Sequence, residues 1–246
     1  MSKNYRTDEH GHRIRNLILS GIPEREFLLL KPDLRYVEFS AGQNLQEPGD
    51  LIDSCYFINS GLVSLVVDTH SGKSVEVGVA GYEGMTGDTL AAGIKRTTHW
   101  AVTEVAGDGF RISGGALEDA MQTARELEKK AHRFTAIQML QVAQTAACNR
   151  LHDIGQRLAR WLLLTDDRVR AKTLLVTHDF LSMMLGTDRT SVTAAAQSLQ
   201  KRGVVDYSRG KLRILRRKEL ESAVCECYAA IAQFNRELGL TPDSTD

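Results

Sequence analysis

The segment from Thr177 to Gly203 constrains this chain more than any other, because it reads as two short helices folded around Gly186. Thr177 can cap the first helix and Asp188 the second, since both side chains accept hydrogen bonds from free backbone N–H groups. Apolar residues in the second helix recur at the spacing of one buried face: Val192, Ala195, Ala196 and Leu199. This pattern predicts a helix-turn-helix.

The outer face of the second predicted helix suits the major groove of DNA. An Arg side chain can donate two hydrogen bonds to guanine, and Thr can bond a base edge or contact a thymine methyl group. The predicted DNA-binding residues, including the caps and the basic residues of the following turn, are Thr177, Thr187, Asp188, Arg189, Thr190, Ser191, Thr193, Ala194, Gln197, Lys201, Arg209 and Lys211. An ordinary helical hairpin with a solvated outer face is the alternative that this segment leaves open.

Two short runs of strand-forming residues follow the helix pair, from Val204 to Tyr207 and from Leu212 to Leu215. Residues 208–211 (SRGK) separate them and are typical of a hairpin turn. A helix-turn-helix with such a hairpin predicts a winged helix, whose basic turn would lie beside a DNA phosphate. The basic run 216–218 (RRK) is expected to extend the same patch.

Charge is distributed unevenly along the chain, although Lys and Arg balance Asp and Glu at 31 each. Residues 150–220 carry a net charge of +8, whereas residues 1–149 and the tail from 221 each carry −4. A basic domain within a neutral chain favours a nucleic-acid partner, because much of the affinity for DNA comes from counterion release at phosphates. A solvated basic face is the alternative interpretation.

Composition is that of an ordinary globular protein, with 42% hydrophobic and 25% charged residues. We expect a cytoplasmic protein with no membrane partner, because no apolar run approaches the ~18 residues of a membrane span and the N-terminus lacks a signal-peptide core.

The four cysteines, Cys55, Cys148, Cys225 and Cys227, match neither a disulfide framework nor a four-cysteine zinc site. We interpret them as reduced thiols and expect no metal site, while the role of Cys225 and Cys227 stays open.

The spacing of glycines and apolar residues divides the chain into four parts. From residue 35, short strand-like pieces between glycines predict an antiparallel, jelly-roll-like β-roll sensor domain over residues 14–120. Residues 121–149 are predicted to form a long dimerisation helix and residues 150–220 the winged helix-turn-helix. A C-terminal helix and tail occupy residues 221–246, and the fold class is α+β.

The long predicted helix carries a stripe of side chains that is longer than one small core needs. Its members, spaced three and four residues apart, are Phe134, Ile137, Gln141 and Gln144. We predict that this stripe is the seam of a homodimer, because two DNA half-sites require a two-fold axis. Packing of the helix on its own roll is the alternative.

The order of these parts resembles the Crp/Fnr family of bacterial transcription regulators over nearly the whole chain. AGQNLQEPGD followed by CYFINSGLVSLVV is similar to the family's roll pattern, and GTDRTSVTAAAQSLQKRGVV is similar to its recognition helix, with the Arg at Arg189. The resemblance implies a dimeric regulator that places residues 189–201 in the major groove of double-stranded DNA, with RNA polymerase as a further candidate partner. The family typically has Glu after that Arg, whereas this chain has Thr190, and its later basic reader falls on Ala194. The family's target sequence therefore does not carry over.

In the same family a Gly-Glu-Leu loop and an Arg-Ser-Ala segment hold a cyclic nucleotide. The matching positions define a candidate effector pocket: Gly84, Met85, Thr86, Arg96, Thr97 and Thr98. Met85 offers no carboxylate for the ribose hydroxyl, and Thr97 stands where the family's Arg holds the cyclic phosphate. The iron–sulfur branch uses N-terminal cysteines, and this chain has none before Cys55. We therefore predict no cofactor, and an effector that is not cyclic AMP and whose identity stays open.

Enzyme chemistry is disfavoured by the residues present. A metal-dependent cupin on such a roll would need three converging ligands, and His70 and His99 supply only two. The chain also contains no nucleophile elbow and no Walker loop. A second function class stays open, in which the roll senses a small molecule and the C-terminal domain binds a protein partner rather than DNA.

Overall fold

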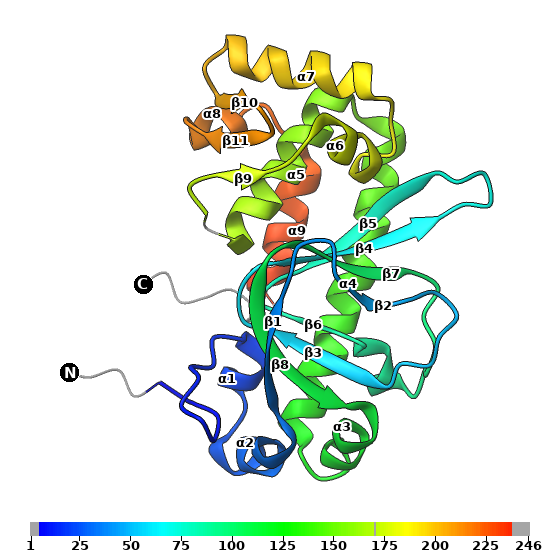
Figure 1. The fold of residues 1–246 in the computed structure, drawn as a ribbon, viewed down its shortest axis with the longest axis vertical. Helices are drawn as coiled ribbons and strands as arrows, with labels where there is room; N and C mark the ends of the chain where they lie inside the picture. Colours follow the sequence, from blue (N-terminus) through cyan, green and yellow to red (C-terminus); the bar gives the residue numbers. More distant parts are fainter. Residues whose placement is uncertain (1–4, 170, 238–246) are drawn as a thin grey trace. The chain divides into compact units, whose positions relative to one another are not determined.

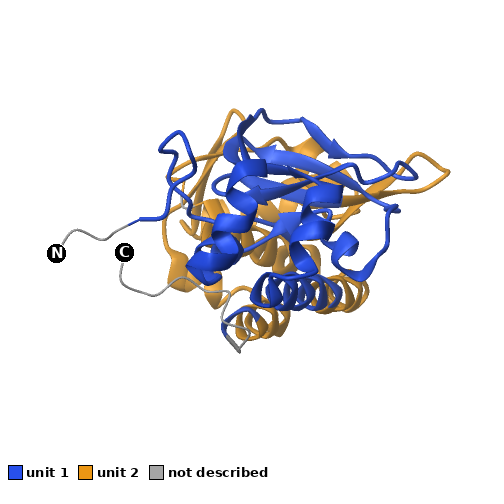
Figure 2. Cartoon of the chain, turned by 90° about the horizontal axis from the view of Figure 1, so that it is seen from below, with its two compact units in different colours: residues 1–65, 79–139, 235–246 blue, residues 66–78, 140–234 orange. Residues whose placement is uncertain are grey.

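The computed structural model describes residues 5–169 and 171–237 (Figure 1). The chain forms two compact units, coloured separately in Figure 2. Among the described residues, unit 1 comprises residues 5–65, 79–139 and 235–237, and unit 2 comprises residues 66–78, 140–169 and 171–234. Two continuous elements, a β-hairpin and a long helix, therefore contribute to both units.

Unit 1 contains short N-terminal helices, the strands of a roll and the beginning of the long helix. Its elements are α1 (Leu17–Gly21), α2 (Glu24–Leu30), η1 (Lys31–Asp33), β1 (Arg35–Phe39), β2 (Asn44–Gln46), β3 (Ser54–Ile58), part of β4 (Leu62–Asp68), the end of β5 (Ser74–Ala80), β6 (Met85–Thr86), η2 (Asp88–Ala92), β7 (Trp100–Val105), β8 (Gly107–Ser113), α3 (Gly114–Met121) and the first half of α4 (Arg125–Leu151).

The strands form two four-stranded sheets, in the order β1-β8-β3-β6 and β2-β7-β4-β5. Strand β8 pairs antiparallel with two neighbours, so that Phe110 lies opposite Tyr36 on one side and Phe57 on the other. Gly61 makes one of the close turns, because its φ is +86° and a Cβ atom there would lie 2.5 Å from the Val105 carbonyl oxygen. The predicted antiparallel roll is confirmed.

The core of unit 1 is closed by one face of α4. Phe27, Phe57, Phe110 and Phe134 belong to one buried cluster, and each is at most 1% exposed. Phe134 comes from α4, and a Cβ atom at Gly84 would lie only 2.1 Å from its ring. Burial of each such side chain contributes about 1.5–3 kcal/mol, so α4 is an integral part of the roll.

This packing shows that the predicted dimer seam is wrong. Phe134 and Ile137 are 1% and 3% exposed and lie in the core of unit 1. In unit 2, Gln141 is buried and Gln144 is half-buried, with its Nε2 donating to Cys227 Sγ at 3.1 Å. The stripe packs against its own chain, which is the alternative interpretation, and side chains already buried there are not available to a second copy.

Unit 2 contains the far end of the β4–β5 hairpin and the rest of the chain through most of the last helix. Its further elements are the second half of α4, α5 (Ile154–Val169), β9 (Leu174–Leu175), α6 (His178–Met184), α7 (Arg189–Lys201), β10 (Val205–Ser208), β11 (Lys211–Ile214), α8 (Arg217–Glu221) and most of α9 (Glu226–Glu237). Strand β9 pairs with β11 and extends the wing to the order β10-β11-β9. The sequence did not predict β9, because two residues carry too little pattern.

The β4–β5 hairpin packs on the helical part of unit 2. Trp161 Nε1 of α5 donates to Glu76 Oε2 of β5 at 3.2 Å, and both side chains are buried. A Cβ atom at Gly186 would lie 2.9 Å from Val75, so the turn of the helix-turn-helix lies close against this hairpin. No helix in the described part of the chain is long and apolar enough to cross a membrane.

Candidate nucleic-acid interface

Helix α6 begins and ends where the sequence predicts. The side chain of Thr177 accepts a hydrogen bond from the Phe180 backbone N–H at 3.1 Å, which caps the helix. Leu181 and Met184 are buried, and the helix is followed by Gly186 with a φ of +57°. Glycine adopts this left-handed conformation without steric cost, so the chain can turn directly into the second helix.

Helix α7 is held by the cap at Asp188. Asp188 Oδ1 accepts from the Ser191 backbone N–H at 2.9 Å, and Oδ2 accepts from Ser191 Oγ at 2.7 Å. These hydrogen bonds from Ser191 lower the pKa of Asp188, which keeps a negative charge at the positive end of the helix dipole. Both predicted caps, Thr177 and Asp188, are confirmed.

The two faces of α7 differ as the sequence predicts. Val192, Ala196 and Leu199 are buried, and Ala195 is half-buried. The exposed side chains on the other face are Arg189, Thr190, Ala194, Gln197 and Lys201. Helix α7 therefore presents one basic residue in its first turn, small and polar residues along its length, and another basic residue at its end.

Some of the predicted DNA-binding residues are engaged in local bonds. Thr193 Oγ1 donates to the Arg189 carbonyl oxygen at 2.8 Å and lies 3.1 Å from His178 Nδ1. Ser191 serves the cap at Asp188. Thr187 lies in the turn, where its backbone N–H donates to the Ser182 carbonyl oxygen at 3.0 Å. In this structure these three residues hold the helices in position.

The wing hairpin has the backbone conformation that a two-residue turn requires. Ser208 pairs with Lys211, and between them Arg209 has a φ of +50° and Gly210 a φ of +74°. Two successive positive φ values are the requirement of a type I′ turn. Tyr207 Oη donates to the Val176 carbonyl oxygen at 2.9 Å, which ties the wing to the segment before α6.

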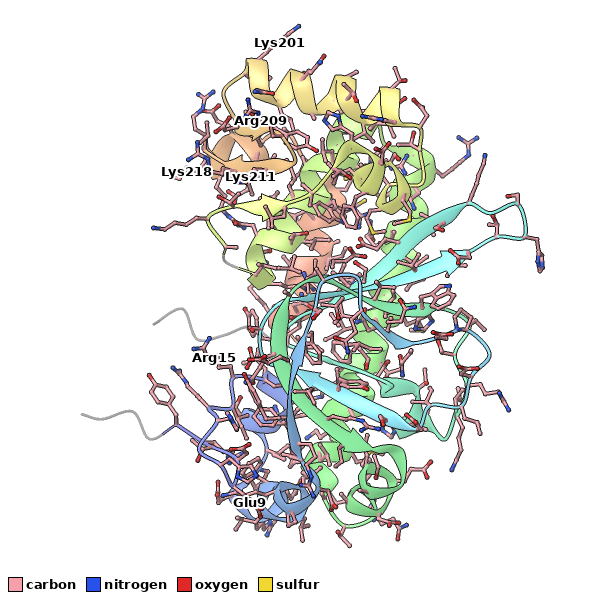
Figure 3. All side chains as sticks on the ribbon, viewed as in Figure 1. Glu9, Arg15, Lys201, Arg209, Lys211 and Lys218 are labelled. Carbon is pink, nitrogen blue, oxygen red and sulfur yellow. The ribbon has the colours of Figure 1, made fainter. Side chains whose placement is uncertain are left out.

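A hollow of about 470 Å³ lies between α6, α7 and the wing. It brings together four of the residues predicted to bind DNA: Thr177, Arg189, Gln197 and Arg209. Figure 3 shows Lys201 at the end of α7, and Arg209 and Lys211 on the neighbouring wing. His178 and Tyr207 also line the hollow, with ring centroids 4.7 Å apart. The sequence analysis missed both residues, although they flank Thr177 and the wing turn.

Several basic residues of this domain serve its own packing. Arg157, Arg160 and Arg168 of α5 are at most 7% exposed. Arg217 forms ion pairs with Asp166 and Asp167, so it is not available to extend a DNA-binding patch.

Arg216, the first residue of the predicted basic run, is also engaged with its own chain. Its Nε donates to the Gly203 carbonyl oxygen at 2.9 Å, and its Nη1 pairs with Glu219 at 2.6 Å. Lys218 is exposed and appears on the outside of the wing region in Figure 3. Of the run 216–218, Lys218 is therefore the residue placed to extend the basic surface.

Residues of the candidate effector pocket in unit 1 have different environments. Met85 and Thr86 form β6, pair with Phe57 and Tyr56, and are 1% exposed. Gly84 precedes them and packs against Phe134. Met85 is part of the apolar core, so its side chain does not point into an open site.

The second half of that candidate pocket lies on the loop before β7. The Arg96 guanidinium donates to the Gly49 carbonyl oxygen, and Thr98 is exposed. Thr97 is buried, with its Oγ1 at 3.0 Å from His99 Nδ1, and burial lowers the pKa of His99. Thr97 lines a hollow of about 200 Å³ that Glu47, Asp50 and Asp53 also line, which is an unfavourable setting for a phosphate.

The described chain thus combines an N-terminal β-roll with a C-terminal winged helix-turn-helix, the kind of domain found in DNA-binding regulators. Two family models match the chain: the cyclic nucleotide-binding domain over residues 36–124 and the Crp-like helix-turn-helix domain over residues 156–223. Together they cover more than half of the sequence. The chain belongs to the Crp/Fnr family of transcription regulators, and it is not an enzyme.

Solved structures of Crp/Fnr regulators share the fold. The c-di-GMP responsive global regulator CLP of Xanthomonas campestris is 17% identical, with a TM-score of 0.65 over 78% of this chain and 99% of that one. The regulator TTHA1359 of Thermus thermophilus is 23% identical, with a TM-score of 0.64 over 77% and 97%. FixK2 of Bradyrhizobium japonicum is 14% identical, with a TM-score of 0.63 over 78% and 98%. No curated protein sequence matches the chain significantly.

Because Arg209 has a left-handed backbone conformation, we expect its replacement by glycine to affect protein stability and DNA affinity in different directions. An L-residue with a side chain in this conformation costs about 1–2 kcal/mol, and glycine avoids that cost. Arg209→Gly should therefore keep or raise the melting temperature while weakening DNA binding and reducing its salt slope by about one unit. Thermal unfolding and DNA titrations at several salt concentrations measure both effects.

Arg209→Lys is the matched control, because it keeps the charge and the backbone strain. It should retain the salt slope and the stability of the parent protein. Equal salt slopes for the parent and Arg209→Gly would show that the wing tip does not contact a phosphate.

Proposed function

We propose that this protein is a dimeric, sequence-specific regulator that inserts α7 into the major groove of double-stranded DNA. The observation that carries the proposal is the exposed face of α7, which presents Arg189 in its first turn beside a basic wing. Helices of this kind read base edges with their N-terminal residues, while neighbouring basic groups hold the phosphate backbone.

The environment of each side chain suggests its role on DNA. Arg189, Thr190, Ala194 and Gln197 are exposed along α7 and would face the bases. Thr177, Lys201, Arg209 and Lys211 would contact phosphates, since they lie at the helix ends and on the wing. Asp188 and Ser191 would position α7 rather than read DNA, because they bond each other in the cap.

Arg189 would exchange one partner for another on binding. Its Nε lies 3.4 Å from Asp179 Oδ1, and both side chains are more than 60% exposed. An exposed ion pair contributes about 0–1 kcal/mol, so breaking it costs little compared with the gain from a bidentate bond to guanine. In the unbound protein, Asp179 would also hold the Arg189 guanidinium on the exposed side of α7 that would face the major groove.

Base reading by Arg189 can be tested directly. Arg189→Ala should cost about 1–3 kcal/mol on the preferred site and flatten base preference at one position in each half-site. The preferred site comes from selecting bound duplexes out of a random pool, followed by titration of single-base variants. Lys201→Ala is the control, because loss of a phosphate contact should weaken binding equally on every sequence.

Two results would contradict this assignment. A uniform loss of affinity for Arg189→Ala on all sequences would make Arg189 a phosphate contact. Failure of the parent protein to select any duplex would instead favour a C-terminal domain that binds a protein partner.

The outward face of α4 is the better candidate for the dimer seam. Four exposed residues recur there at steps of three, four and three: Ala136, Met139, Ala143 and Ala146. This is the spacing of a coiled-coil seam, and the small alanines would let two helices approach closely. Met139 is 65% exposed and Val142 beside it is 36% exposed. A two-fold seam along α4 would provide the paired recognition helices that two half-sites need.

Two neighbouring substitutions separate this seam from the one that the sequence predicted. Met139→Glu should shift the protein toward the monomer in analytical ultracentrifugation and weaken operator binding, with little change in melting temperature. Ile137→Asp should instead unfold the roll. Removing a large buried side chain alone lowers the stability by about 2–5 kcal/mol, and the aspartate would also place a charge in the apolar core. A Met139→Glu protein that stays dimeric would place the interface elsewhere.

The roll would act as a sensor or docking module whose signal reaches unit 2 through continuous elements. Strands β4 and β5 run from the roll into unit 2, where Glu76 bonds Trp161 of α5. Helix α4 likewise continues from the core of unit 1 into unit 2. Once bound to DNA, the regulator would have RNA polymerase as a candidate partner.

Cyclic AMP is not the effector in this proposal. A cyclic phosphate taken into the roll without a guanidinium would leave a desolvated, unpaired charge, at a cost of several kcal/mol. Arg96 bonds the Gly49 carbonyl oxygen, and Met85 has no carboxylate for the ribose. Calorimetric titration should therefore show no micromolar binding of cyclic AMP. Micromolar binding that disappears in Arg96→Ala would overturn this expectation.

A further inference from the structure

Four side chains of the types that bind metals meet inside unit 2, away from the DNA-binding face. They are Cys148, His152, Cys225 and Cys227, and their ligand atoms all lie within 4.8 Å of one another. We call this group the Cys3His cluster. The three thiols are at most 3% exposed, whereas the His152 side chain is 15% exposed. The cluster is therefore enclosed on the thiol side and close to the surface at the imidazole.

We propose that the Cys3His cluster binds one Zn²⁺ ion through three thiolates and one imidazole. Zinc in proteins binds thiolate sulfur at about 2.3 Å and imidazole nitrogen at about 2.0–2.1 Å in a tetrahedron, which places neighbouring ligand atoms roughly 3.5–3.8 Å apart. The Sγ atoms of Cys148 and Cys225 are 3.6 Å apart, and Cys227 Sγ lies 3.5 Å from His152 Nδ1. These two distances fit the edges of such a tetrahedron.

Local structure brings the ligands together within each of two pairs. Cys148 and His152 are four residues apart, and the His152 N–H donates to the Cys148 carbonyl oxygen at 3.1 Å, so both side chains lie on the same helical face. Cys225 and Cys227 flank Glu226 at the start of α9. The spacings are Cys-x3-His and Cys-x-Cys, and each pair alone supplies only half of a tetrahedral site.

The neighbours of the cluster have the roles expected of groups that orient metal ligands. His152 Nε2 lies 3.3 Å from Glu226 Oε1, so a neutral imidazole can donate its Nε2–H hydrogen bond to this carboxylate and keep Nδ1 free for the metal. Gln144 Nε2 donates a hydrogen bond to Cys227 Sγ at 3.1 Å, which favours the thiolate form that binds a metal. Arg160 is buried and its Nη1 donates to Thr145 Oγ1 of α4 at 3.0 Å, three residues before Cys148, so its positive charge can offset the single negative charge of one Zn²⁺ with three thiolates.

A zinc ion accounts for all four side chains better than a disulfide or an iron–sulfur cluster does. A disulfide between Cys148 and Cys225 would use two sulfurs, require an oxidant and leave Cys227 and His152 unexplained. Zinc binding requires no redox step, because the three thiols release three protons and the imidazole binds in its neutral form. A set of three sulfurs and one nitrogen in a tetrahedron suits zinc, whereas iron–sulfur clusters usually take four cysteines.

A four-ligand site leaves no open position and is therefore structural rather than catalytic. Within unit 2 it would tie the start of α9 to the end of α4, next to the short link into α5. The metal would stabilise the helical frame that carries α6 and α7 while remaining separate from the predicted DNA contacts. The proposal is thus independent of the identity of the operator and of the effector.

Metal analysis of the full-length protein tests the site. After expression with added zinc and removal of loosely bound metal, the protein should hold about one zinc per chain. Replacement by Co²⁺ should produce thiolate-to-cobalt charge-transfer bands and the d–d absorption of a tetrahedral centre. Cys225→Ser and Cys227→Ser should lose the metal, whereas Cys55→Ser, a buried thiol of the roll, should retain it.

Glu226→Ala keeps the test valid if the cysteine variants fail to fold. The Glu226 side chain is 79% exposed, so its removal should leave the fold intact while lowering zinc affinity about 10–100-fold. Three outcomes would overturn the proposal: four free thiols with no zinc bound after its addition, a Cys148–Cys225 disulfide found by mass spectrometry, or bound iron and sulfide in place of zinc.

Discussion

Packing of α4 against the roll is the interaction on which the rest of this structure depends. Phe134 and Ile137 close the apolar core of unit 1, and the same helix continues into unit 2. Because one face of α4 packs on the roll, the opposite face, which carries Met139, is exposed. The C-terminal end of α4 places Cys148 beside Cys225. Core formation, the proposed dimer seam and the proposed zinc site therefore use different parts of one helix.

On the proposed DNA-binding face, two neighbouring turns differ in how well the residue suits its backbone conformation. At the start of α7, Asp188 accepts a hydrogen bond from a backbone N–H that would otherwise have no partner in the helix, so this residue suits its position. Arg209, in contrast, occupies a left-handed conformation that glycine would adopt at lower cost. The proposed phosphate contact would give a reason for a charged side chain at that turn.

The roll has the architecture of the cyclic nucleotide-binding domain, and our proposal that cyclic AMP is not its effector rests on two features of its interior. Met85 fills the core, and the hollow at Thr97 is lined by carboxylates. The hairpin bond between Glu76 and Trp161 nevertheless joins roll strands to the helices of unit 2. The proposed sensor and the proposed reader therefore share continuous elements of secondary structure, whatever ligand the roll binds.

Sequence by itself determined the features that depend on residues close together in the chain. The caps at Thr177 and Asp188 and the turn at 208–211 follow from bonds between residues three apart, so their chemistry is visible in any short window. Periodicity also showed that one face of α4 is buried. Only the tertiary structure decided what covers that face, because the spacing of the buried residues is the same whether the roll or a second copy packs on them. It also brought Cys148 and Cys225 together across 77 residues, a distance over which spacing carries no signal.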